Sequence, residues 1–216
     1  MSDDLNLIEA ARIGAAITSN PVELPPGHPL CVKSPLAVST AGVAKVVQDE
    51  LRRKYNNPEF RLIAHNKVTD PYNPGFASLD EVNKIAQFSY AVDHSECWQR
   101  FVAIKEMMHI YTGRFNKSCG TDILASAVKA MENFTLDIHK PLDPEAFCIF
   151  LALEVALPRK NRDKLYDLRY KHELPDYPIA VKCKIPLLFA QELFTQSGSP
   201  YRGYFSMSKK AYEASL

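Results

Sequence analysis

The sequence contains no C-x-x-C pair, no long apolar run and almost no excess of charge of either sign. Its five cysteines are scattered along the chain and odd in number: Cys31, Cys97, Cys119, Cys148 and Cys183. This spacing argues against a zinc site built from thiolates and against a framework of disulfides. We therefore expect most of these cysteines to be reduced, partly buried thiols.

The charges are balanced, because 26 lysines and arginines against 25 aspartates and glutamates give a formal net charge of +1. Because the charges are so evenly balanced, the composition does not indicate the excess of positive charge that binds nucleic acid or an anionic membrane. No apolar segment approaches the roughly 20 residues that a membrane span needs. The acidic opening Met1-Ser2-Asp3-Asp4 is also unlike the basic start of a secretory signal. We expect a cytoplasmic protein.

A length of 216 residues suits one medium-sized domain with an appendage. Residues 1–38 are predicted to form a helix, over residues 7–17, and then an arm in which five prolines deny regular structure: Pro21, Pro25, Pro26, Pro29 and Pro35. We expect this arm to pack on the main body or to serve in association. Residues 39–200 would form the main domain and residues 201–216 a C-terminal tail.

Apolar periodicity predicts both helices and strands in the main domain. Helices are expected over residues 39–55, 95–113, 121–131, 143–157 and 159–171, with a helix-turn-helix pair within residues 178–194. One strand is expected over residues 60–65 and one or two more within residues 85–92, separated by a turn-rich passage at residues 70–75. Small strands among amphipathic helices indicate an α+β fold, with a small sheet beside the helix of residues 95–113.

Two of these helices have clear boundaries. Ser95 is a plausible N-cap and Gly113 a plausible stop for a helix whose apolar spacing is typical of a half-buried element. Asp143-Pro144-Glu145 provides a cap, a proline at the first helical position and an acid in the first turn. The helix that follows is apolar nearly all round and is therefore expected to be buried, with Glu154 as its one conspicuous charge.

The helix of residues 95–113 carries Lys105-Glu106-Met107-Met108-His109, which differs from the His-Glu-x-x-His motif of zinc proteases at one position. In the intact motif two histidines on one helical face hold zinc, and the glutamate acts on a zinc-bound water. Lys105 replaces the first histidine, and an ammonium group has no lone pair to give a metal ion. Glu106 and His109 on their own form a common pair of side chains that often marks only a locally bonded face.

The order of these features resembles the ImmA/IrrE family of zinc metallopeptidases. The resemblance covers about residues 62–194 and depends on three stretches: residues 99–110, the buried helix that ends in Leu153-Glu154-Val155-Ala156-Leu157-Pro158, and the helical pair that follows. It implies a zincin-like α+β fold in which a small sheet packs against a mostly helical body. It also implies that Glu106 is the general base, active or vestigial, and that His109 is a zinc ligand.

The family's third ligand is a glutamate on the later helix, and counting back from Pro158 places that position near Phe147. The two candidates are Glu145 and Glu154, and neither is an easy replacement, because Glu145 lies about 200° around the helix and Glu154 about two turns further along. His65, His94 and His139 are further sources of imidazole, although none has the spacing of a ligand. Lys105 could instead form an ion pair with Glu106 or Glu154 that fills the former metal cavity.

Three functional hypotheses follow. The favoured one is a catalytically degenerate metallopeptidase-like protein without zinc that acts as a binding or regulatory module. The alternative is an active zinc endopeptidase with a rearranged site. Because members of the family are associated with cleaving transcriptional repressors, often in mobile elements, both imply a protein or peptide partner such as a transcriptional regulator. In the third, the motif is accidental, and Glu106 and His109 do not share a pocket with the helix of Glu154.

Overall fold

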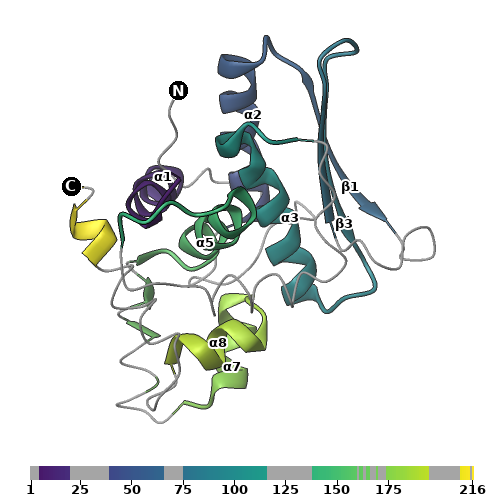
Figure 1. Ribbon diagram of the computed structural model, residues 1–216. Helices are drawn as coiled ribbons and strands as arrows, with labels where there is room; N and C mark the ends of the chain where they lie inside the picture. The colour runs from purple at the N-terminus through teal and green to yellow at the C-terminus, as the bar shows by residue number, and fades with distance from the viewer. Residues whose placement is uncertain are drawn as a thin grey trace.

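The computed structural model shows a mixed α+β protein that is mostly helical, with one small sheet at its side (Figure 1). It describes residues 5–19, 39–65, 75–115, 138–159, 161–162, 164–165, 169, 174–194, 210–214 and 216. The predicted helix of residues 121–131 and the proline-rich arm lie outside the described residues. The predicted helix of residues 159–171 is described only in part.

Three strands form the sheet, in the order β1-β3-β2. β1 (Glu59–His65) runs parallel to β3 (Ile85–Ala91), and β2 (Gly75–Asp80) runs antiparallel to β3. The strands at β1 and β3 confirm the prediction. β2 was not predicted, because its alternation of buried and partly exposed residues is short and directly follows the turn-rich passage.

The centre of the molecule is α3 (Glu96–Thr112), which lies between the sheet and α5 (Pro144–Ala156) (Figure 1). Gly113 ends α3 in the left-handed conformation, with φ of 64°, as predicted, whereas Ser95 occupies the N-cap position without a side-chain hydrogen bond. The expectation of a half-buried helix was wrong. Every residue from Arg100 to Ile110 is buried, because the sheet, α2 (Thr40–Lys54) and α5 cover different faces of the helix.

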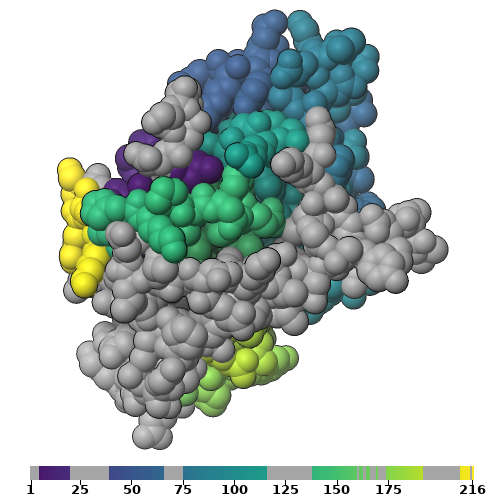
Figure 2. Space-filling model, in the orientation of Figure 1, coloured from purple at the N-terminus to yellow at the C-terminus, as the bar shows by residue number. Residues whose placement is uncertain are grey.

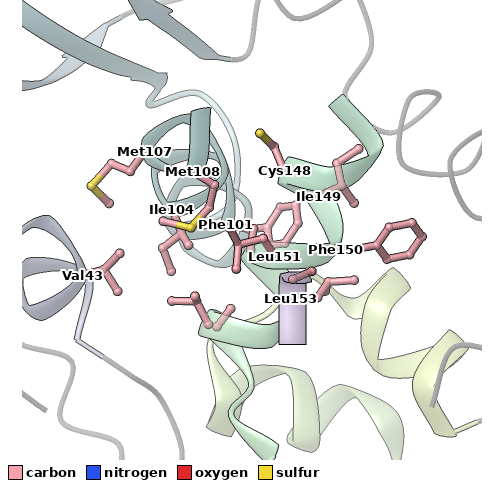
Figure 3. Packing of buried hydrophobic residues seen from close by; sticks show 14 of the residues in the cluster. Val43, Phe101, Ile104, Met107, Met108, Cys148, Ile149, Phe150, Leu151 and Leu153 are labelled. Carbon is pink, nitrogen blue, oxygen red and sulfur yellow. The ribbon is translucent and has the colours of Figure 1, made fainter. Parts of the chain in front are cut away.

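The core lies between α3 and α5. Apolar side chains of the two helices meet there, among them Phe101, Ile104 and Met108 on α3 and Leu151 on α5, while Val43 of α2 closes the other side (Figure 3). The Asp143 side chain caps α5 by accepting hydrogen bonds from the backbone N–H groups of Glu145 and Ala146. The prediction of a capped, buried helix is confirmed, since every residue of α5 from Ala146 to Ala156 is buried.

α1 (Leu7–Ser19) packs on the outer side of α5. The contact is close at Gly14, where an added Cβ would lie 2.5 Å from the Cβ of Glu154. α7 (Asp176–Cys183) and α8 (Leu187–Phe194) form the predicted helical pair, and Ile185 and Phe189 join the core from this pair. Among the described residues, no helix is both long and apolar enough to cross a membrane.

Candidate functional site

One face of α3 presents the degenerate motif to α5. Lys105 and His109 are four residues apart and Glu106 and His109 are three apart, so all three side chains project from neighbouring positions on the helix. The side chains of Lys105 and Glu106 are 0% exposed and that of His109 is 6% exposed. Charged groups this deeply buried require partners, because removing an unpaired charge from water is costly.

Glu145, in the first turn of α5, is the partner that the fold supplies. The Asp143 cap fixes that turn, and the positive end of the α5 dipole favours a carboxylate there. Its side chain is 28% exposed, so the cluster reaches the protein surface at this residue. Figure 2 shows α5, in green, lying across this face of the molecule next to the teal of α3.

The four side chains Lys105, Glu106, His109 and Glu145 form what we call the charge cluster. The Lys105 Nζ lies 2.9 Å from Glu106 Oε1 and also contacts Glu145 Oε1. The His109 Nε2 lies 3.5 Å from Glu145 Oε2 and 3.7 Å from Glu106 Oε2. Each carboxylate therefore faces both an ammonium group and an imidazole, and the predicted ion pair between Lys105 and Glu106 is present.

The imidazole of His109 is held in its charged form. Burial lowers the pKa of His109, but the neighbouring sulfur of Cys148 and the carboxylates of Glu145 and Glu106 outweigh burial and raise this pKa from 6.5 to about 10. At neutral pH the cluster thus pairs two carboxylates with two cations. A neutral sum is what a buried cluster of ions requires.

The sheet closes the cluster from the side opposite α5. Gly75, the first residue of β2, lies so close to α3 that an added Cβ would be 2.5 Å from Val102 Cγ1 and 2.7 Å from Glu106 Oε1. The absence of a side chain at position 75 therefore permits the sheet to lie directly over the glutamate of the motif.

The structure brings together only some of the residues that the sequence nominated. Lys105, Glu106, His109 and Glu145 meet, whereas Glu154 lies elsewhere on α5, where its Oε2 is 2.8 Å from Arg162 Nη2. The three other histidines that the sequence nominated occupy different parts of the fold, with His65 at the end of β1, His94 before α3 and His139 exposed before α5.

The donor set of the charge cluster does not fit a bound zinc ion. Zinc needs three protein donors with available lone pairs, and the Lys105 ammonium has none and occupies both carboxylates. Within the part of the chain that the structure describes, no three His, Cys, Asp or Glu side chains are placed to hold one metal ion.

Two neighbours of the cluster, Cys148 and Gly75, were not anticipated. Cys148 follows Glu145 by three residues and therefore shares its helical face, a spacing that would have placed the thiol near His109 once Glu145 was placed there. Burial alternates along β2, but the polarity of Phe76-Ala77-Ser78-Leu79 does not, because Phe76 and Ala77 are both apolar; Gly75 therefore had no strand signal beside it.

Comparison with known proteins adds no relative: no protein-family model matches this chain, and no curated protein matches it significantly.

Proposed function

We propose that this protein is a metallopeptidase-like scaffold that has lost catalysis and acts as a binding or regulatory module. The observation that supports the proposal is the position of the Lys105 ammonium group. It stands between the carboxylates of Glu106 and Glu145, at the place where the resemblance would put a metal ion.

An ammonium group can replace the charge of a metal ion but not its chemistry. It neutralises the surrounding carboxylates, yet it neither accepts a lone pair from a ligand nor polarises a bound water molecule. Glu106 would act as a general base only toward such a water, and here it is paired with Lys105 and covered by Gly75. The cluster thus preserves the packing of a metal site without its reactivity.

The finer features of the proposal come from the resemblance together with the geometry. The zincin-like arrangement would consist of the small sheet, the motif helix α3 and the glutamate-bearing helix α5. The partner would be a protein or peptide such as a transcriptional regulator, bound by a cytoplasmic protein. The third hypothesis, an accidental motif, expected Glu106 and His109 to lie apart from α5. The contact of His109 with Glu145, and the position of Lys105 between Glu106 and Glu145, weigh against it.

The active-peptidase alternative makes the opposite prediction for metal content, so elemental analysis separates the two. The wild-type chain, purified without chelator and then supplied with zinc, should hold no stoichiometric metal and should cleave no peptide from a mixed library. The His109→Ala variant serves as the reference. Zinc near one per chain that disappears in this variant, together with zinc-dependent cleavage, would overturn the proposal.

A further inference from the structure

The contact between Lys105 Nζ and Glu145 Oε1 joins a primary amine to a carboxyl group inside the molecule. We propose that these two side chains condense into an intramolecular isopeptide bond, which links α3 covalently to α5. This inference depends only on the geometry of the charge cluster. It uses the same Lys105 side chain as the proposed function. In a linked chain the Lys105 Nζ would be an amide nitrogen, which offers zinc no lone pair either, so the prediction of metal content is the same whether or not the bond forms.

Proximity supplies the first requirement. The two helices are packed along the core, so the amine and the carboxyl group are held together rather than meeting by diffusion (Figure 3). Well-oriented groups of this kind react with effective molarities of roughly 10⁵–10⁸ M. That advantage offsets the barrier that prevents amines and carboxylic acids from condensing in water.

Removal of a proton from Lys105 supplies the second requirement, because an ammonium group is not a nucleophile. Glu106 Oε1 lies 2.9 Å from the Lys105 Nζ and can accept this proton directly. Both side chains are 0% exposed, so bulk water does not compete for the proton between them. Glu106 is thus placed as the proton carrier of the reaction.

The third requirement is a positive charge beside the carboxyl group under attack. His109 Nε2 lies 3.5 Å from Glu145 Oε2, while Lys105 contacts Oε1. An imidazolium at this position stabilises the negative charge that develops on the oxygen as the tetrahedral intermediate forms. The side-chain exposure of Glu145, 28%, gives the released water a route to solvent.

The reaction balances without any further reactant. Lys105 gives one proton to Glu106, and its nitrogen lone pair then attacks Cδ of Glu145 to form the new C–N bond. A C–O bond of Glu145 breaks, and that oxygen leaves as water with the two protons that the Lys105 nitrogen loses, the first of which Glu106 accepted. One N–H remains in the amide. Glu106 and His109 are left as a neutral pair, so the buried charges balance before and after the reaction.

The chain contains its own control pair. Lys184 Nζ and Glu96 Oε2 are also 2.9 Å apart, but the Glu96 side chain is 75% exposed. Water stabilises both ions there, because the carboxylate of this pair lies at the surface and not in a buried cluster. We expect no condensation between these two residues.

Intact-mass spectrometry of the full-length chain tests the proposal. The wild-type protein should be lighter than its sequence by one water molecule, and fragmentation of tryptic peptides should join the segments that contain Lys105 and Glu145. The Lys105→Arg and Glu106→Gln variants should keep the full mass, with folding checked by circular dichroism. If Glu106→Gln does not fold, Glu106→Asp keeps a carboxylate and should show a lower fraction of linked chains.

The outcomes are distinct. A folded wild-type chain with its full sequence mass would overturn the proposal, as would a loss of water that persists in Lys105→Arg. A link between Lys184 and Glu96 in the same digest would show that contact alone is sufficient and would overturn the role of Glu106. A linked Lys105–Glu145 peptide in the wild type, absent from both variants, would establish the bond.

Discussion

Replacing Lys105 by methionine should destabilise the fold strongly, and the reason lies in the charge balance of the cluster. Lys105 faces Glu106, whose side chain is 0% exposed, and Glu145, whose side chain is 28% exposed, so the packed helices exclude most water from both carboxylates. Methionine fills a similar volume, so loss of packing adds little. Removing one partner from a buried ion pair costs about 3–5 kcal/mol, because the charge that remains is uncompensated.

The assay is urea unfolding followed by circular dichroism at neutral pH, with the mass of the wild-type chain measured first because a covalent link would add to the loss. Lys184→Met removes the cation of the exposed Glu96 pair and should change the free energy of unfolding by less than about 1 kcal/mol. The double variant Lys105→Met, Glu106→Gln restores a neutral cluster and should recover part of the loss. If Lys105→Met were no more destabilising than Lys184→Met, the cluster would not be a buried set of ions and the reasoning would fail.

Three further predictions follow from the same contacts. Gly75→Ala and Gly14→Ala should each destabilise the protein by about 1–3 kcal/mol, since the added Cβ meets Val102 and Glu106 at position 75 and Glu154 at position 14. Ala16→Ser, at an exposed position of α1, is the control. A stabilising Gly14→Ala would refute the close packing of α1. Because the pKa of His109 is raised from 6.5 to about 10 in the folded protein, its contribution to stability is full below pH 6.5 and is lost as the pH rises to about 10. Urea unfolding between pH 6 and pH 10 should show this decline, on the order of a few kcal/mol, and His109→Gln should remove it; an equal decline in the variant would contradict the assignment. Burial raises the pKa of Cys183 to about 12, so its thiol should react slowly with iodoacetamide. Peptide mapping after brief treatment should find the partly exposed Cys97 modified well before Cys183. Equal rates of modification would argue against the packing of α7.

The elements that the sequence predicted well are those with local signals. Asp143-Pro144-Glu145 specifies the start of α5 through a cap and a proline that act within one turn, and Gly113 ends α3 for an equally local reason. The extent of burial of α3 depends instead on what surrounds it. From the sequence alone, the charged residues of α3 indicate a half-buried helix. The structure shows that they have partners inside the protein: Lys105 pairs with Glu106, and Arg100 donates to the backbone carbonyl of Lys184.

The choice between Glu145 and Glu154 shows where sequence reasoning stopped. Counting back from Pro158 assumed that α5 keeps the register of the family, and that count favoured neither residue. In the structure the first turn of α5 packs beside His109, so Glu145 reaches the imidazole, whereas Glu154 pairs with the buried Arg162. The relative placement of two helices depends on long-range packing, and the spacing of residues within one helix does not predict it.

The central claim is that the Lys105 ammonium group stands in place of a metal ion, and the Lys105→His variant tests it most directly. This single change restores His-Glu-x-x-His on α3 and leaves Glu145 and His109 facing the position that the ammonium group has left. Titration of zinc into the two proteins, followed by calorimetry, should show one site per chain in the variant and none in the wild type, with the site lost when His109→Ala is added. A variant that binds no zinc although it folds like the wild type, or a wild-type chain that binds zinc equally well, would contradict the claim.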